Sequence, residues 1–396
     1  MNILVTNVGS TSLKYRLYSF PNEELKAVGR VERIGQGTGR AEWKHGTQEG
    51  AKEIEFPTHK EAVEFVLEQL AINTLKDMSE LDCVAFKTVI AKNRVGCEFL
   101  DDEVLHAMEE YIFLAPAHNP PYINAIKMFR QLLPDTPLIG LFEPAFHLTM
   151  PEKAKVYPIP KEWREKYGIQ RYGFHGASHR YVSEHTPQLV EKSARDLKII
   201  SCHLGGSSSL AAIDGGKSID TSMGFTPQTG VFQGTRIGDF DPFAVFYVMK
   251  EEGLPIDDMV RILTKESGLK GLSGISEDMR DLVQAMDEGN ADAKLAFEAY
   301  CYGIKKTIGS LYAVLGGLDV LCFAGGIGER GSRVREEVCR GLEHLGIQLD
   351  LAKNKECNGS EENIATTDSS TAIWVIPTNE ELIVGRAAYI KLRKQA

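Results

Sequence analysis

The sequence lacks several features that would assign it to a specialised class of protein. Its seven cysteines are odd in number and none lies in a CxxC pair, which argues against a disulfide framework or a cysteine-based zinc site. No uninterrupted apolar stretch approaches the roughly 18–20 residues of a membrane-spanning helix. Neither a basic leader segment nor a low-complexity tract is visible. We therefore expect a soluble protein of the reducing cytoplasm.

Positive charge is also in short supply. The chain has 45 Lys and Arg residues against 55 Asp and Glu residues, which gives a net charge of −10. The field of such a molecule repels nucleic acid and anionic lipid, so we expect neither nucleic acid nor membrane as a partner. Any phosphate group has to be held by a local site.

The remaining composition is that of an ordinary globular protein. Hydrophobic residues make up 43% of the 396 residues and charged residues 25%. A chain of this length exceeds the roughly 250–300 residues at which single cores stop growing. Two domains are therefore expected.

A strand–turn–strand phrase occurs twice in the chain. Residues 3–5 form an apolar run that leads through a Gly/Ser turn at 9–12 into an alternating segment at 13–18. The same order returns at residues 199–214, with a Gly/Ser turn at 205–209. The recurrence indicates a duplicated half-molecule, although two unrelated hairpins with small turn residues would look alike.

Helical and strand-like patterns alternate between and after these phrases, which indicates an α/β fold. The proline-rich segment 114–121 is predicted to be a fixed loop, and the domain border to lie near 143–152. The expected helices include 60–75, 103–113 and 291–315, and the expected strands 84–90, 138–142 and 320–323, the last ending in a glycine turn.

Three Gly/Ser-rich turns follow apolar strands, at 9–12, 205–209 and 325–328. Such turns can present backbone N–H groups and hydroxyls to a phosphate. None matches the Walker pattern or a strict GxGxxG, so P-loop and dinucleotide-binding interpretations are poor. Plain hairpin geometry remains the alternative for each turn taken alone.

Two further segments carry the residues that phosphoryl transfer requires. In segment 171–180, His175 and His179 lie four residues apart, and in segment 234–242 Arg236 lies close to two aspartates. Phosphoryl transfer needs cationic donors for the oxygen charge, and carboxylates that hold Mg²⁺ or orient the nucleophile. A His-x₃-His zinc site is the rival interpretation, but no HExxH pattern accompanies it.

With these motifs the chain resembles the acetokinase family, which comprises acetate kinases and the related propionate and butyrate kinases. The match runs from segment 7–15 to segment 377–382 and is most specific at 171–182, 220–242 and 325–336. The resemblance implies an α/β, duplicated actin-like and sugar-kinase-like ATPase fold of two domains with a cleft between them. The acid-side domain would comprise residues 1–145 plus about 382–396, and the nucleotide-binding domain residues 146–381.

The resemblance also implies the reaction, its cofactor and the oligomeric state. The γ-phosphoryl group of ATP would be transferred to a short-chain carboxylate, acetate first, giving an acyl phosphate and ADP. Mg²⁺ would assist, with Mn²⁺ as an alternative, and the protein would be a homodimer.

Site residues carry over where this chain matches the motifs of the family. Asn7 and Glu380 would belong to the metal environment, and Glu143, His175 and Arg236 would be catalytic. The alternatives to these functional roles are structural: a turn-forming Asn7, a His175 satisfied in the core, and an Arg236–Asp pair. The substrate-binding residues would be Lys87, Val89, Ala117, His118, Phe174 and Pro227, where a loop-bracing role for His118 also stays open. The nucleotide-binding residues would be Ser10, Ser12, Lys14, His203, Leu204, Gly205, Gly206, Ser207, Asp278, Met279, Arg280, Gly326, Ile327, Gly328, Glu329 and Arg330.

The chain departs from the family pattern at several of these positions. Lys87 stands where the family has an arginine, so a charge is kept but the bidentate fork is lost. Glu143 replaces an aspartate, which displaces the carboxylate by about 1 Å. The usual Asn-Gly of the nucleotide turn is Gly206-Ser207, a usual asparagine is Arg330 and a usual leucine is Ala117.

Three hypotheses accommodate these departures. The protein is an acetate kinase that tolerates them, an acyl kinase retuned for another acid or phosphoryl donor, or a binding or regulatory module with little turnover. The retained Asn7, His175, Arg236 and Glu380 count against the third hypothesis, because these residues serve phosphoryl transfer rather than folding.

Overall fold

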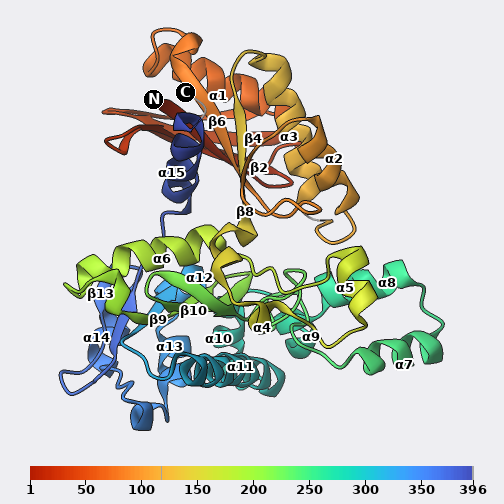
Figure 1. Ribbon diagram of the computed structural model, residues 1–396, viewed down its shortest axis with the longest axis vertical. Helices are drawn as coiled ribbons and strands as arrows, with labels where there is room; N and C mark the ends of the chain where they lie inside the picture. Colours follow the sequence, from red (N-terminus) through yellow and green to blue (C-terminus); the bar gives the residue numbers. More distant parts are fainter. Residues whose placement is uncertain (117, 395–396) are drawn as a thin grey trace. The chain divides into compact units, whose positions relative to one another are not determined.

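The computed structural model describes residues 1–116 and 118–394, which form two compact units (Figure 1). Unit 1 consists of Met1–Ala145 and Asn379–Ala396, and unit 2 of Phe146–Thr378. Each unit is built on one mixed β-sheet with helices packed on it. The α/β prediction is thereby confirmed.

The sheet of unit 1 has eight strands in the order β5-β4-β3-β2-β1-β6-β8-β7. Its central strand β1 pairs antiparallel with β2 through the turn at 9–12 and parallel with β6. Strand β1 is buried along most of its length, so residues at its ends can present side chains at the surface while the rest of the strand stays in the core. The strands are β1 Asn2–Val8, β2 Ser12–Ser19, β3 Glu24–Glu32, β4 Thr38–His45, β5 Gln48–Glu55, β6 Leu81–Thr88, β7 Cys97–Phe99 and β8 Leu138–Phe142.

The described part of unit 1 also contains four α-helices, whose ends follow local chemistry. α1 begins after Thr58, whose side chain accepts a hydrogen bond from the backbone of Lys60, while Glu61 reaches back to the Thr58 backbone in a capping box. The C-terminal helix α15 packs against β1, β6 and β8, so the chain returns to unit 1 at its end. The helices are α1 His59–Asn73, α2 Asp102–Glu110, α3 Asn119–Leu132 and α15 Glu380–Arg393.

The sheet of unit 2 repeats this topology with six strands in the order β11-β10-β9-β12-β14-β13. Its strand β9 pairs antiparallel with β10 through the second Gly/Ser turn and parallel with β12, as β1 does with β2 and β6. The duplication predicted from the two strand–turn–strand phrases is therefore confirmed. The strands are β9 Lys198–Leu204, β10 Ser208–Asp214, β11 Lys217–Thr221, β12 Val320–Ala324, β13 Glu362–Asn363 and β14 Ala372–Val375.

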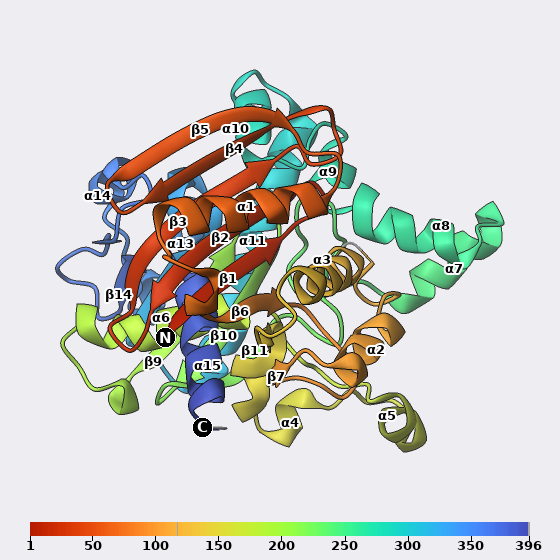
Figure 2. The same cartoon turned by 90° about the horizontal axis from the view of Figure 1, so that it is seen from above.

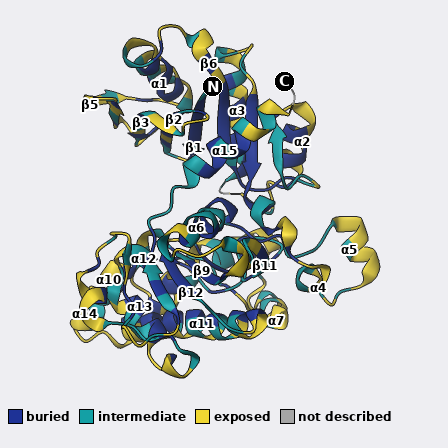
Figure 3. Ribbon diagram, turned by 60° about the vertical axis from the view of Figure 1, so that its left-hand side comes forward, coloured by how far each residue is buried: buried dark blue, intermediate teal, exposed yellow. Residues whose placement is uncertain are grey.

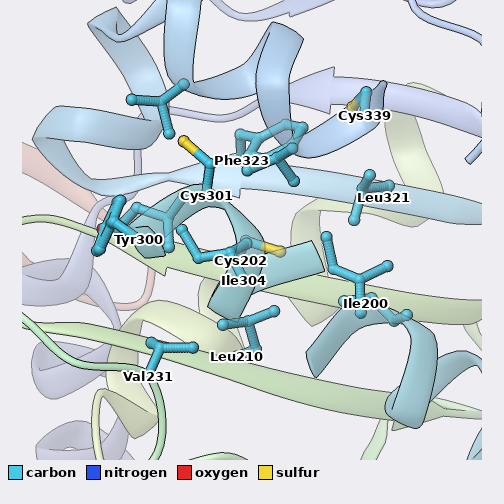
Figure 4. Close-up of a cluster of buried hydrophobic side chains, with 14 of the residues drawn as sticks. Ile200, Cys202, Leu210, Val231, Tyr300, Cys301, Ile304, Leu321, Phe323 and Cys339 are labelled. Carbon is cyan, nitrogen blue, oxygen red and sulfur yellow. The ribbon is translucent and has the colours of Figure 1, made fainter. Parts of the chain in front are cut away.

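Both faces of this second sheet are covered, and the residues of β9, β10 and β12 alternate between two cores. Figure 4 shows Cys202, Leu321 and Phe323 of the core on the side of the long helix α11, Ala291–Leu315. Their neighbours Val320 and Cys322 lie in the opposite core with Val182 of α6, Gly176–Leu189. The central strands of both units are accordingly among the most buried segments of the chain (Figure 3).

Eleven α-helices belong to the described part of unit 2. α11 begins at the Asn290 cap and ends at Gly316, which has the left-handed conformation that favours glycine. The helices are α4 Glu152–Lys155, α5 Lys161–Tyr167, α6 Gly176–Leu189, α7 Pro242–Glu252, α8 Ile256–Arg261, α9 Gly268–Ser273, α10 Met279–Asp287, α11 Ala291–Leu315, α12 Gly325–Arg330, α13 Ser332–Cys339 and α14 Leu351–Glu356.

The local predictions were correct for the strand at 138–142 and the helix at 291–315, and wrong in two places. The loop predicted over 114–121 gives way to α3 at Asn119, because Pro120 and Pro121 lie in the first helical turn, where no N–H is needed. The glycine turn predicted at 325–328 is the short helix α12. Gly325 itself has φ +74°, and a Cβ there would lie 2.6 Å from the Leu204 carbonyl oxygen.

In the part of the chain that the structure describes, no helix is at once long and apolar enough to span a bilayer.

Candidate active site

Three of the predicted site residues form a cluster of charges in unit 1. The Lys87 ammonium, at the end of β6, lies 3.1 Å from the Glu143 Oε1 atom and also contacts the Glu380 Oε2 atom. The three side chains are only 17%, 7% and 15% exposed. Strand β6, the segment after β8 and the start of α15 bring them together from distant parts of the sequence.

The two carboxylates keep Lys87 charged in this partly dry environment. Burial by itself would lower the pKa of the Lys87 ammonium, but the charges of Glu143 and Glu380 outweigh burial and raise this pKa well above its usual value. Lys87 thus acts as the counter-ion that lets two carboxylates lie close together. Removing it would leave two like charges in low dielectric.

Asn7 lies at the end of β1, where a tyrosine absent from the predicted site contacts it. The Tyr122 hydroxyl of α3 donates a 3.1 Å hydrogen bond to Asn7 Oδ1. Tyr122 is 3% exposed, and burial raises the pKa of its phenol. Asn7 pairs with Lys14 across the β1–β2 ladder, and the Gly9 N–H bonds the Ser12 carbonyl in the turn between them. Ser10 and Lys14 are exposed, so both can reach a ligand in solvent.

The donors near this cluster suit a hard divalent cation. Asn7 and Glu380 offer amide and carboxylate oxygens, and Mg²⁺ is commonly held by one or two such groups together with substrate phosphates and water. No cluster of three or more His, Cys, Asp or Glu side chains able to hold a metal occurs within residues 1–116 and 118–394. The residues therefore fit a metal that is shared with a phosphate ligand rather than caged by protein alone.

His175 lies at the N-terminus of α6 in unit 2. It has φ +54°, a left-handed backbone that is uncommon for a residue with a side chain and is concentrated at functional sites. Two residues earlier, Gly173 approaches the ring of His147 so closely that a Cβ would lie 2.6 Å from it. His175 Nδ1 is 2.8 Å from Ser209 Oγ, and its ring stacks on His203 with centroids 4.2 Å apart. These contacts hold the imidazole in one orientation.

His179, the second histidine of the motif, is fully buried one helical turn later. Its Nδ1 lies 2.9 Å from Ser201 Oγ and its Nε2 lies 2.8 Å from Ser209 Oγ. Both ring nitrogens are thus engaged by serine hydroxyls, which argues against the alternative of a His-x₃-His zinc site. Ser209 bridges His179 and His175 instead.

The buried histidines predict how the stability of unit 2 depends on pH. Burial lowers the pKa of His147 from 6.5 to about 4, and it also lowers the pKa of His179 well below its usual value. Between pH 6.5 and about 4 the unfolded chain binds protons that the native state does not, so stability falls as the pH falls. For His147 alone the loss on going from pH 7.5 to pH 5 is about 2 kcal/mol.

Urea unfolding at pH 7.5 and pH 5 measures this effect, and His147→Gln is the comparison that isolates it. The glutamine does not titrate, so the free energy of unfolding of the variant is expected to change by about 2 kcal/mol less over the same interval. Equal pH dependence of the two proteins would contradict the assignment of a neutral buried His147.

Arg236 lies on an irregular segment of unit 2 and contacts neutral oxygens. Its Nη1 donates to Ser207 Oγ at 3.2 Å, Pro227 O at 3.3 Å and Gln233 Oε1 at 3.3 Å. Among residues 1–116 and 118–394, no carboxylate forms an ion pair with it. The structural Arg–Asp pair is therefore ruled out for Arg236, and a partly buried guanidinium without an anionic partner suits an anionic ligand.

Apart from Ser10, Ser12 and Lys14 of unit 1, the residues predicted to bind the nucleotide fall into three segments of unit 2. Residues 203–207 and the start of α12 lie together, since a Cβ on Gly205 would be 4.0 Å from the Gly326 backbone nitrogen. The third segment begins next to Gly234, which lies against Glu277. Here Asp278 caps α10 and pairs with the exposed Arg280 at 2.6 Å. The side chains of Leu204 and Met279 lie in the hydrophobic core, so only their backbones can face a ligand.

Arg335 of α13 fixes α12 from inside the protein. It is fully buried and donates to the carbonyls of Gly328 and Glu329 at 2.8 Å, as well as to groups of Asn354 and Cys357. The C-terminal carbonyls of this glycine-rich helix are thereby satisfied, and the predicted nucleotide residues Ile327 to Arg330 sit on a supported backbone.

Comparison with known proteins gives the same answer over nearly the whole chain. Residues 2–386 match the model of the acetokinase family. The chain belongs to the acetokinase family. It is 45% identical to the acetate kinase of Dictyoglomus turgidum, over 98% of this chain and 96% of that protein. The acetate kinase of Porphyromonas gingivalis superposes with a TM-score of 0.87 at 37% identity, covering 99% of both chains.

A propionate kinase from Francisella tularensis superposes equally well, with a TM-score of 0.88 at 34% identity over 98% of both chains. The predicted membership and the duplicated α/β ATPase fold are confirmed by these matches. Phosphoryl transfer to a short carboxylate is the enzyme activity that they support, as the sequence predicted.

The departures from the acetokinase pattern have different structural settings. Lys87 and Glu143 are in direct contact, so these two departures from the family pattern affect the same ion pair. A Cβ on Gly206 would meet no atom within 4 Å, so this position has room for the family's asparagine. Ser207 instead places a hydroxyl against Arg236. Arg330 is exposed and lies near Gly359.

The residues predicted to bind the acid lie in both units. Val89 is buried just after β6 in unit 1, whereas Phe174 and Pro227 are buried in unit 2. His118 is half-buried and precedes α3, and Ala117 lies outside the described residues. Val89 and Phe174 are 8% and 2% exposed, so each could contribute only a small apolar surface to a ligand.

Three residues next to the site were missed by sequence reasoning. Tyr122 contacts Asn7, Gln233 contacts Arg236 and Ser209 contacts His175. Ser209 belongs to the Gly/Ser turn at 205–209, which was predicted as a candidate phosphate site. Gln233 comes one residue before the predicted segment 234–242. Tyr122 had no such signal, because its role depends on how α3 packs against β1.

Proposed function

We propose that the protein transfers the γ-phosphoryl group of ATP to a short-chain carboxylate, with acetate as the principal substrate. A carboxylate oxygen attacks the γ-phosphorus, the bond from this phosphorus to the β,γ-bridging oxygen breaks, and acyl phosphate and ADP result. The observation that carries the proposal is the guanidinium of Arg236, which is partly buried and, among the described residues, is held by neutral oxygens alone. Such a group is ready to stabilise negative charge that develops on a phosphoryl oxygen.

His175 is the second group assigned to the transferred phosphoryl group. Its ring is fixed by Ser209 and by stacking on His203, so it can donate a hydrogen bond without first being reoriented. The nucleotide is assigned to unit 2, along residues 203–207, 278–280 and 326–330. Ser10, Ser12 and Lys14 of unit 1 are assigned to phosphate oxygens.

Lys87 and Glu143 are assigned to the acid side, in unit 1. An ammonium group has three donors, and those of Lys87 face the carboxylates of Glu143 and Glu380. A carboxylate substrate would be a further acceptor for the same cation. Glu143, fixed by this contact, would orient the nucleophile, while Val89, Phe174 and Pro227 would supply apolar contacts to the acyl group.

Asn7 and Glu380 would hold Mg²⁺, or Mn²⁺, which when bound neutralises phosphate charge. The contribution of this chain is to present an amide and a carboxylate oxygen, with Tyr122 orienting the amide and Lys87 the carboxylate.

A coupled assay decides among the three hypotheses for the departures. Acyl phosphate is trapped as hydroxamate with acetate, propionate or butyrate as acceptor and with ATP, GTP or pyrophosphate as donor. The proposal expects the highest rate with ATP and acetate. A preference for another pair would support the retuned kinase, for which the open space at Gly206 is the structural argument. No product from any pair with folded protein would leave only the binding module.

We further propose that the protein is a cytoplasmic homodimer. Six of the seven cysteines are buried as thiols, which suits a reducing compartment. Helix α7, labelled in Figure 2, has no buried residue. It exposes Phe243, Phe246 and Tyr247 by 77%, 62% and 65%. An exposed cluster of three aromatic side chains is typical of a contact surface, and a second copy of the chain would cover this cluster.

The double variant Phe243→Glu, Phe246→Glu tests this surface. Charges on the face are expected to shift the protein from dimer to monomer in size-exclusion chromatography with light scattering, because two glutamates would be buried unpaired. Leu351→Glu, at a 59% exposed position of α14, is the control that should leave the dimer intact. A monomeric wild-type protein, or a dimeric double variant, would contradict the assignment.

A further inference from the structure

Next to Arg236 lies a buried polar residue, Gln233, that no predicted role includes. Gln233 is fully buried, and its Nε2 group donates to the Pro227 carbonyl at 2.9 Å. Its Oε1 atom accepts a 2.7 Å hydrogen bond from Ser207 Oγ and a 3.3 Å hydrogen bond from Arg236. Because a carbonyl oxygen can accept from the NH₂ group of an amide but not from its oxygen, the Gln233 Nε2 group faces Pro227 and the amide oxygen is directed towards Ser207 and Arg236.

The backbone around this network is fixed as well. The Gly234 N–H donates to the Gly206 carbonyl at 3.2 Å, which joins the Ser207 turn to the segment that carries Gln233 and Arg236. The start of α9 holds the same segment, since the Leu269 N–H donates to the Gln233 carbonyl at 2.8 Å. A Cβ on Gly268 would lie 2.1 Å from that carbonyl oxygen, so this approach requires glycine. The network therefore rests on a rigid frame.

The chemistry of the acceptors decides what the network does. Nη1 of Arg236 is held by a hydroxyl and two amide-type carbonyl oxygens, all of them neutral. A carboxylate in the place of Gln233 would hold the guanidinium more tightly but would also cancel its charge. Neutral acceptors fix the position of one nitrogen and leave the positive charge for an external anion.

We propose that Ser207 and Gln233 are positioning residues that hold Arg236 in place without neutralising it, for an anion of the phosphate class. The identity of that anion as the transferred phosphoryl group rests on the proposed function, whereas the positioning itself does not. Ser207 stands where the family pattern has glycine, so its hydroxyl is a contribution of this chain to the control of Arg236.

Four variants test the proposal in the full-length protein. Ser207→Gly removes the hydroxyl that accepts a hydrogen bond from Arg236 and donates one to Gln233. This variant is expected to lower kcat about 10-fold, with KM for both substrates changed less than about twofold. Ser207→Thr restores a hydroxyl and should recover kcat to within about threefold of wild type. Gln233→Glu is nearly isosteric but supplies a carboxylate, and it should lower kcat by about 100-fold or more. Gln233→Leu removes the amide and should give an intermediate loss.

A binding measurement separates this proposal from the proposed function. Calorimetric titration with pyrophosphate, without an acid substrate, is expected to show binding to the wild type, at most about twofold weaker binding to Ser207→Gly and at least about tenfold weaker binding to Gln233→Glu, whose carboxylate repels the anion. These results would support the positioning role even if the wild type made no acyl phosphate.

The proposal is overturned if Gln233→Glu binds pyrophosphate as the wild type does, or if the wild type does not bind it. Equal losses in Ser207→Gly and Ser207→Thr would also overturn it, because the hydroxyl would then be irrelevant. Thermal melting of each variant shows whether it is folded. If Gln233→Glu fails to fold, the variants Ser207→Gly and Ser207→Thr decide the question alone, because both of them keep the fully buried Gln233 side chain.

Discussion

Replacing Arg236 by alanine is expected to lower kcat by about 10²–10³-fold while KM for ATP and acetate changes only a few-fold. The guanidinium is partly buried, is not paired with a carboxylate in the described part of the chain and would meet charge that is fully developed only in the transition state. A group that acts on the transition state lowers kcat and kcat/KM together. Steady-state kinetics with the hydroxamate assay measures both parameters.

Two further variants control for charge and for folding. Arg236→Lys keeps the charge but loses the fork, so it is expected to fall between wild type and alanine. Arg333→Ala removes an exposed arginine that pairs with Asp287 at 2.7 Å, and it should leave kcat unchanged. An unchanged kcat in Arg236→Ala would remove this residue from the transition-state role.

The second large effect concerns the contact between Lys87 and Glu143. Both residues depart from the family pattern, and in the structure the longer carboxylate meets the shorter cation at 3.1 Å. Glu143→Asp alone and Lys87→Arg alone are each expected to lower kcat about 10-fold or more, because each changes the reach of one partner only. The double variant should recover most of the loss, since an arginine restores the reach that aspartate gives up.

This prediction is a double-mutant cycle, and its measured quantity is the deviation from additivity. Additive losses, with the double variant worse than either single variant, would show that the two changes are not matched to each other. Glu143→Asp in combination with Lys391→Arg is the matched control. Lys391 pairs with Glu98 at 3.3 Å in the same unit, so its replacement should not rescue Glu143→Asp.

The same cluster is expected to govern the stability of unit 1. Lys87→Met leaves Glu143 and Glu380 near each other without a cation, and it should lower the free energy of unfolding by about 3–5 kcal/mol. Lys391→Met, which breaks a pair whose side chains are about 30% exposed, should cost about 1 kcal/mol or less. Urea unfolding compares the two, and equal losses would show that Lys87 is not the counter-ion of the two glutamates.

Much of the architecture followed from local sequence pattern. The repeated strand–turn–strand phrase predicted a duplication, because apolar alternation interrupted by small turn residues admits few local structures. In the structure the two sheets share this arrangement, in the orders β2-β1-β6 and β10-β9-β12. Helix 291–315 was predicted with its true ends because the Asn290 cap and Gly316 mark them locally. Strands β4 and β5 were missed, since their polar and glycine-containing residues carry little apolar alternation.

The predicted site shows the same division. His175 and Arg236 could be named from short motifs, because phosphoryl transfer restricts the residue types that serve it, whereas Lys87 and Glu143 were named from the resemblance to the acetokinase family. The partners of these residues could not, because Gln233 and Ser207 are 26 positions apart, His175 and Ser209 34 positions, and Tyr122 and Asn7 115 positions. Contacts over such separations are fixed by packing and by strand register, neither of which a local pattern encodes.

By itself, then, the sequence determined the fold class, the duplication, the family and the residue types of the chemistry. Tertiary structure alone decided that Lys87 lies between two glutamates and that Arg236 meets no carboxylate among the described residues. The physical reason is that the charge available to a ligand depends on what surrounds each ionised group in three dimensions. A lysine substituted for an arginine, and a serine for a glycine, acquire their meaning only from those neighbours.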